Sequence, residues 1–330
     1  MPLLNVNATA TGLSLHATSW SADTRICDLA RGPGPAILMV HGYKYAPGSA
    51  RHCPHQKIFR AGRGAWPAAL GFDGQTPQEG LGIAFGWYAR GPLAKVHSRA
   101  RHLGWHLARI IRMLHKTHTD RPIHLIGHSL GVEVILNALP NVPEAAVDRM
   151  ILLSGASYQS DALNMLASPA GRRADVLNVV SRENDVFDAA FERLVPRRVF
   201  ADRAIGDGLD APNVVNLQID CNASLRALAS LSLGIAPARN RICHWSTYRR
   251  AGAMTLYNEF LRRPSSLKPD HLRQVLPDQL QPRWSRLKPK LTDVKPFRHP
   301  ILHPARLELG FAQRRTASAP ARSTHHDHAY

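Results

Sequence analysis

One serine in this sequence has the neighbours that a nucleophile needs. Ser129 is the central residue of G-H-S-L-G at 127–131. The apolar residues 123–126 before this pentapeptide predict a strand, and residues 132–139 after it predict a helix. A serine at the apex of such a strand-to-helix turn is a nucleophile elbow. The chemistry expected there is attack of the serine hydroxyl on a carbonyl carbon.

Three glycines are expected to make room for this turn. A side chain two residues before or after the serine would collide with the strained backbone, which explains Gly127 and Gly131. Gly42 follows the apolar strand 36–40 and predicts a second close approach of the backbone to the same place.

A serine hydroxyl needs a base, and His244 is the candidate. In elbow-type sites the acid follows the serine and the base follows the acid. His244 lies between the last expected strand, 214–220, and a closing helix expected at 247–262. Every later histidine falls in an irregular C-terminal region: His271, His299, His303, His325, His326 and His328. His244 therefore fits the role of base best, and the alternative is a histidine that merely begins a helix.

Asp185 is the candidate for the acid that orients the base. It lies just past the carboxyl end of the strand expected at 176–180, where catalytic groups of open α/β sheets are found. Glu183, Asp188 and Asp220 are its rivals, and a helix cap is the non-catalytic alternative for Asp185.

Backbone amides are expected to bind the oxyanion that forms during attack. The N–H groups of Tyr43, after the strand 36–40, and of Leu130, at the start of the elbow helix, are the candidates. Trp87 ends another expected strand and is a candidate for lining the substrate pocket, with a plain core position as the alternative.

Strands and helices must alternate to bring these residues together. Besides the strands around the elbow, apolar runs predict strands at 81–87 and 147–153, a basic amphipathic helix at 93–118 and an edge strand or hairpin within 1–30. This order predicts the α/β class, a mostly parallel central sheet with helices on both faces.

The domain organisation follows from where the alternation stops. We expect a catalytic domain at 1–263 and an extended or disordered basic, proline-rich tail at 264–330. Two long connections, 44–80 and 201–243, are candidates for lids or binding loops.

The strong positive charge bears on partners. The chain carries a net charge of +18, with a sequence pI near 10.6. Residues 264–330 hold 12 Lys and Arg against 5 Asp and Glu, a net of +7. No nucleic-acid-binding motif accompanies this charge, so we expect no specific nucleic-acid partner and at most weak contact of the tail with anionic membranes. The sequence does not indicate the oligomeric state.

Composition also bears on compartment and cofactors. Residues 1–20 lack the basic start and apolar run of a signal peptide, and four scattered cysteines fit a cytoplasmic chain. A bridge between Cys221 and Cys243 stays open. No glycine pattern indicates a nucleotide cofactor and no ligand spacing indicates a metal, so we expect neither.

Residues 36–262 resemble the α/β-hydrolase family. The resemblance rests on the strand ending in His41-Gly42, on G-H-S-L-G, on Asp185 and on His244. G-H-S-L-G is common in lipase- and esterase-like members. The longer stretches 41–49 and 181–185 are similar to those of uncharacterised bacterial members, and this similarity implies no substrate.

The function expected from these residues is hydrolysis of a carboxylic ester, such as a lipid or acyl ester. Ser129 would attack, His244 would move the proton, Asp185 would orient His244, and water would resolve the acyl-enzyme. A thioester or an amide stays open, because these residues do not select the leaving group. The alternative is a scaffold without catalysis that binds anionic partners through its basic surface.

Overall fold

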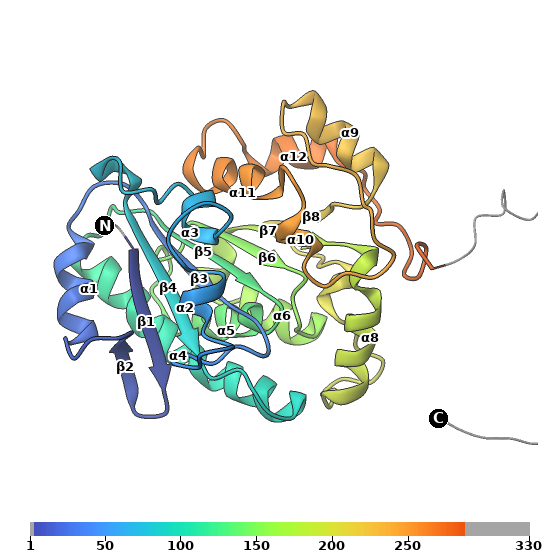
Figure 1. The fold of residues 1–330 in the computed structure, drawn as a ribbon. Coiled ribbons are helices and arrows are strands. Elements are labelled where there is room, and N and C mark those ends of the chain that lie inside the picture. Colours follow the sequence, from blue (N-terminus) through green and yellow to red (C-terminus); the bar gives the residue numbers. More distant parts are fainter. Residues whose placement is uncertain (1–2, 288–330) are drawn as a thin grey trace, which may run out of the picture. The chain divides into compact units, whose positions relative to one another are not determined.

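A single mostly parallel sheet forms the centre of the molecule (Figure 1). The structure, a computed structural model, describes residues 3–287. The sheet has eight strands in the order β2-β1-β4-β3-β5-β6-β7-β8, and only β1 and β2 pair antiparallel. The strands are β1 (Leu3–Thr9), β2 (Gly12–Leu15), β3 (Ala36–Val40), β4 (Leu81–Trp87), β5 (Ile123–His128), β6 (Arg149–Leu153), β7 (Asp175–Val180) and β8 (Val214–Gln218).

Helices connect the strands. They are α1 (Ala22–Ala30), α2 (Pro54–Lys57), α3 (Trp66–Ala69), α4 (Leu93–Thr117), α5 (Leu130–Ala138), α6 (Gln159–Leu166), α7 (Pro169–Arg173), α8 (Asp185–Leu194), α9 (Asn222–Ser230), α10 (Ser246–Arg249), α11 (Ala253–Arg262) and α12 (Pro269–Val275). Short 3₁₀ turns occur at η1 (Pro77–Glu79), η2 (Leu139–Asn141), η3 (Arg182–Asn184) and η4 (Ile205–Asp207). The expected α/β class, with helices on both faces of the sheet, is confirmed.

The two faces of the sheet bury two separate apolar clusters. In β3, Leu38 and Val40 pack toward α1, α4 and α5, while Ile37 and Met39 pack toward α3, α9, α11 and α12. Side chains alternate between the faces of a strand, so a strand covered on both sides must be apolar throughout. This requirement explains the unbroken apolar run that predicts β3 from sequence.

Two helical details differ from the sequence prediction. The helix expected at 247–262 is divided into α10 and α11 around Gly252, whose φ is +86°. A Cβ at Gly252 would lie 2.0 Å from the carbonyl oxygen of Gly234, so the chain turns there instead of continuing as a helix. The N-terminal hairpin is followed by α1, an amphipathic helix that the sequence analysis did not identify.

The boundary expected at residue 263 is wrong for residues 264–287. These residues belong to the same compact unit as the sheet. They form α12 and bury Leu267, Leu272 and Leu276 against the apolar cluster beneath α11. Residues 288–330, the rest of the expected tail, lie outside the described residues.

The two suspected lid segments also contribute to the core. Residues 44–80 bury Phe59, Trp66 and Leu70 on the sheet. Residues 201–243 include β8 and α9. The parts of these two segments that pack on the sheet or join it therefore have a structural role.

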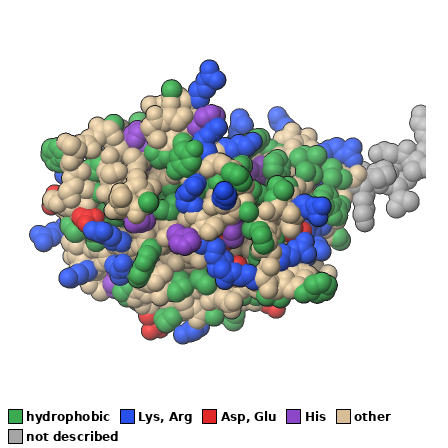
Figure 2. Space-filling view, turned by 90° about the horizontal axis from the view of Figure 1, so that it is seen from below, with side chains coloured by type: hydrophobic (Ala, Val, Ile, Leu, Met, Phe, Trp, Pro, Cys, Tyr) green, Lys and Arg blue, Asp and Glu red, His purple; other side chains and the backbone are tan. Residues whose placement is uncertain are grey.

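The surface reflects the basic composition. In Figure 2, Lys and Arg side chains are spread over the face shown, with few acidic groups and with apolar patches between them. Among the described residues, no helix combines the length and the apolarity needed to cross a membrane.

Candidate active site

Ser129 lies between β5 and α5 in a strained backbone conformation. Its φ and ψ are 54° and −126°, a region that residues with a side chain seldom adopt. A Cβ at Gly131 would lie 2.4 Å from the Val40 carbonyl oxygen, and one at Gly127 would lie 2.7 Å from Ile135 Cδ1. Both glycines are therefore required by close packing, as the elbow geometry predicts.

Two unpaired backbone amides lie near the serine. A Cβ at Gly42 would be 2.8 Å from Ser129 Cβ, so the loop after β3 passes directly against the elbow. Within residues 3–287, neither the Tyr43 N–H nor the Leu130 N–H donates a hydrogen bond to another group. Free N–H groups at a helix start and in an adjacent loop are the donors that an oxyanion requires.

His41 fixes the loop that carries one of these amides. The Trp87 N–H donates to His41 Nε2 at 3.0 Å, so His41 Nδ1 carries the proton and donates to the Gly42 carbonyl at 2.8 Å. Burial lowers the pKa of His41 to about 3, so the ring stays neutral. His41 thus has a structural role.

Trp87 has a core position. It is 0% exposed, its Nε1 donates to the His41 carbonyl at 3.0 Å, and its ring stacks on the His41 ring at 5.5 Å. A side chain with no exposed surface and a satisfied N–H has nothing to offer a substrate. The alternative expected from sequence, a core tryptophan, therefore describes Trp87 better than a pocket role.

His244 lies beside the elbow and is held there by three neighbours. His128 Nε2 donates to the His244 carbonyl oxygen at 2.9 Å, and the two rings are 4.5 Å apart. Phe187 stacks on the His244 ring, with ring centroids 4.6 Å apart. The third neighbour is Asn184, whose Oδ1 lies 2.6 Å from His244 Nδ1.

The expected partnership between Asp185 and His244 is not what the structure shows. Asp185 is 0% exposed, and its carboxylate accepts from Arg182 Nη1 at 3.2 Å and from the Trp284 N–H at 2.6 Å. Residues 182–184 form a 3₁₀ turn, in which successive side chains point about 120° apart. A shift of one position along the chain therefore changes the direction of the side chain. Asn184 points to His244, whereas Asp185 binds the backbone at Trp284.

Asp188 orients the amide of Asn184. Asn184 Nδ2 donates to Asp188 Oδ1 at 2.9 Å, one helical turn further along α8. A carboxyl oxygen that carries no proton only accepts hydrogen bonds, so Asp188 Oδ1 selects the NH₂ side of the amide and leaves the amide oxygen for His244. That oxygen accepts from Nδ1–H, which leaves His244 Nε2 unprotonated and able to accept a proton. The chain His244–Asn184–Asp188 thus fixes the tautomer that a general base needs.

The other acidic rivals are engaged elsewhere. Glu183 pairs with Arg250 and accepts from the Asn240 N–H at 3.2 Å. Asp220 accepts from the Arg182 N–H at 3.1 Å and from Gln218 Nε2 at 3.0 Å.

Burial sets the charge states of the site. It lowers the pKa of His244 well below 6.5, and the nearby His128 adds to this effect. Burial raises the pKa of Asp188 to about 7, while Arg283 and Arg182 act in the opposite direction. At neutral pH, His244 is therefore an uncharged ring that can accept a proton.

Asn184 is the residue that sequence reasoning missed. A carboxylate is the usual partner of the base, whereas Asn184 is a neutral amide. Asn184 lies after the same strand as Asp185 and just before α8. Its position in the chain therefore fits the role, but its residue type does not indicate it.

Comparison with known proteins adds little to this geometry. No family model matches the sequence, and no curated protein matches it. Among solved structures, the chain is similar to a Trichoderma reesei cutinase in complex with a C11Y4 phosphonate inhibitor. The match has 16% identity and a TM-score of 0.25, and covers 47% of this chain and 73% of the cutinase chain.

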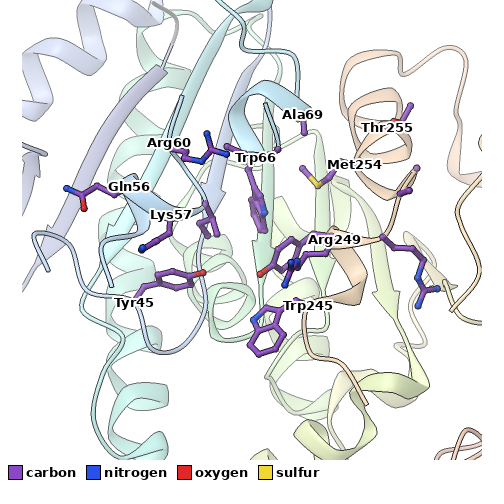
Figure 3. Close-up of a pocket in the computed structure, with 17 residues that line it drawn as sticks. Tyr45, Gln56, Lys57, Arg60, Trp66, Ala69, Trp245, Arg249, Met254 and Thr255 are labelled. Atoms are coloured by element: carbon purple, nitrogen blue, oxygen red, sulfur yellow. The ribbon is translucent and has the colours of Figure 1, made fainter. Parts of the chain in front are cut away.

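A cavity of about 940 Å³ adjoins the site. The loop after β3, α3 and the segment 245–255 line it (Figure 3).

All four cysteines are free, so Cys221 and Cys243 do not pair.

Proposed function

We propose that this protein is a serine hydrolase of the α/β-hydrolase type that cleaves carboxylic esters, with Ser129, His244 and Asn184 as its catalytic residues. The observation that carries the proposal is the hydrogen bond between His244 Nδ1 and Asn184 Oδ1 beside a strained elbow serine. It gives the base a fixed tautomer at the place where the serine needs one.

The reaction begins with attack by Ser129. Its Oγ forms a bond to the ester carbonyl carbon while His244 Nε2 takes the hydroxyl proton. The carbonyl oxygen becomes an oxyanion and accepts from the N–H groups of Tyr43 and Leu130. Each such donor contributes about 3 kcal/mol to the transition state.

Collapse of the tetrahedral intermediate completes acylation. The bond between the carbonyl carbon and the alcohol oxygen breaks, and His244 gives its proton to the leaving alcohol. Water then attacks the acyl-enzyme while His244 accepts its proton, and the proton returns to Ser129 Oγ as the acid leaves.

A neutral amide in the position of the third residue changes the electrostatics of these reaction steps. Asn184 orients His244 but carries no charge to stabilise the imidazolium that forms during attack. Burial raises the pKa of Asp188, behind the amide, to about 7, so this carboxyl group supplies a negative charge through the amide dipole when it ionises above that pH. We infer that Asn184 and Asp188 together take the place of the usual single carboxylate.

Esters are the substrates proposed first because an alkoxide is a better leaving group than an amide nitrogen. Thioesters use the same sequence of steps, with a thiolate leaving.

A panel of 4-nitrophenyl esters of increasing acyl length tests the proposal, with Ser129→Ala as the control. We expect hydrolysis by the native chain and its loss in Ser129→Ala. Equal rates in both chains would overturn the proposal. Absence of hydrolysis of every ester and thioester by folded protein would instead favour a non-catalytic scaffold.

A further inference from the structure

The cavity beside the elbow has a composition that selects one class of ester. We propose that it binds an anionic oxygen group, carboxylate or phosphate, on the acyl or alcohol part of the substrate. This inference rests on the proposed function, because it assigns a specificity to the same site.

The cavity lies next to the proposed catalytic residues. The Tyr248 ring in its wall packs edge-on against His128, with ring centroids 4.9 Å apart, and His128 directly precedes Ser129. Trp245, another wall residue, directly follows His244. A third, Tyr45, contacts His41 edge-on at 5.2 Å. The wall thus touches the elbow, the base and the oxyanion loop.

The charges of the wall all have one sign. Lys57, Arg60, Arg249 and Arg250 line the cavity, and none of the aspartates and glutamates in the described part of the chain does. Arg250 is neutralised by Glu183, and Arg60 donates to carbonyls of its own loop at 2.9 and 3.2 Å. Within residues 3–287, Lys57 and Arg249 form no ion pair and donate no side-chain hydrogen bond.

These two cations come from different elements. Lys57 belongs to α2 and Arg249 to α10, and the close-up shows them on separate parts of the wall with Trp66 and Tyr45 nearby (Figure 3). Two unpaired cations around one hollow create a positive potential that attracts an anion. Lys57 and Arg249 are both exposed, so the contribution of each is modest.

Aromatic rings form the rest of the surface. Trp66 packs edge-on against Tyr248, with centroids 5.2 Å apart. Such rings bury apolar carbon, while the cations bind the charged end. The combination fits an ester with an apolar body and an anionic end. A fully apolar acyl chain would use the rings but would offer the two cations no counter-charge.

A pair of substrates that differ only in charge tests the inference. Mono-4-nitrophenyl glutarate carries a free carboxylate, and its methyl ester, methyl 4-nitrophenyl glutarate, does not. We expect the native chain to hydrolyse the anionic ester with a kcat/KM about 5-fold higher, the scale of two exposed ion pairs. The ratio should fall as the salt concentration rises.

Removal of the two cations locates the effect. In Lys57→Gln/Arg249→Gln the ratio should fall to about one while kcat/KM for the neutral ester stays near the native value, which also shows that the variant folds. Lys116→Gln/Arg226→Gln removes the same types of charge from α4 and α9, outside the cavity, and should keep the native ratio.

The outcomes distinguish failure of this inference from failure of the proposed function on which it rests. Hydrolysis of both esters with no preference for the anionic one would overturn the inference alone, as would a preference that survives in Lys57→Gln/Arg249→Gln. Hydrolysis of neither ester would overturn the proposed function as well. Glutarate or inorganic phosphate should inhibit neutral-ester hydrolysis more strongly in the native chain than in Lys57→Gln/Arg249→Gln, and equal inhibition of both chains would also overturn the inference.

Discussion

Asn184 Oδ1 lies 2.6 Å from His244 Nδ1, where elbow-type sites usually have a carboxylate. The adjacent residue, Asp185, has the expected charge but binds Arg182 and the backbone at Trp284. Under the proposed mechanism, Asn184 orients His244, a task that an aspartate usually performs. The amide fixes the tautomer of His244, and the buried carboxylate of Asp188 behind it holds the amide.

Asn184→Ala is expected to lower kcat for ester hydrolysis about 100-fold, the scale of a poorly positioned general base. Without the amide oxygen, His244 can rotate or carry its proton on Nε2, where it cannot accept from Ser129. Steady-state kinetics on a 4-nitrophenyl ester measure the change. A variant that retains native kcat would show that the amide does not position the base.

Asp185→Asn is expected to leave kcat within about 3-fold of the native value and to lower the free energy of unfolding. Its amide oxygen can still accept from the Trp284 N–H, but the Arg182 guanidinium loses a buried counter-charge. Removal of one partner from a buried pair costs about 3–5 kcal/mol. Urea unfolding and kinetics on the same preparation test this. A loss of kcat as large as that in Asn184→Ala would restore Asp185 as the acid.

Asp188 is expected to make stability depend on pH. Burial raises its pKa to about 7 in the folded chain, whereas the unfolded chain has the ordinary value near 3.8. Between these two values the folded state binds a proton that the unfolded state does not, so stability falls as pH rises.

Asp188→Asn removes this titration. The unfolding free energy of the native chain minus that of the variant should therefore fall as the pH rises from 4.5 to 7.5. Urea titrations across that range measure it. A difference that does not change with pH would show that Asp188 titrates alike in both states.

Gly131→Ala is expected to destabilise the fold by about 3 kcal/mol, the upper end of the cost of overpacking. The added Cβ would lie 2.4 Å from the Val40 carbonyl oxygen and 2.7 Å from that of His41, both backbone atoms. Gly234→Ala is a matched control, because a Cβ there meets nothing within 4 Å. Equal thermal stability of the two variants would contradict the packing described around the elbow.

Much of the fold could be predicted from sequence because it depends on local patterns. The unbroken apolar run of β3 requires burial on both faces, and Gly127 packs against Ile135 and Gly131, which lie within eight residues of it in the chain. The position of His244 between β8 and α10 follows from chain order alone.

The remainder depends on contacts between distant segments. Asp185 lies next in sequence to the residue that contacts His244, and its partner, the backbone at Trp284, is 99 residues away. The break at Gly252 depends on a carbonyl of Gly234, and the burial of Leu272 depends on α11. Periodicity contains no information on such contacts, so the identity of the residue that contacts His244 and the end of the compact unit required the structure.

The most direct test of the account is covalent labelling of the native chain with a fluorophosphonate, followed by mass spectrometry of its peptides. We predict one adduct on Ser129, slower labelling in Asn184→Ala, and a native rate in Asp185→Asn. Absence of labelling in folded protein, or an adduct on another serine that persists in Ser129→Ala, would contradict it.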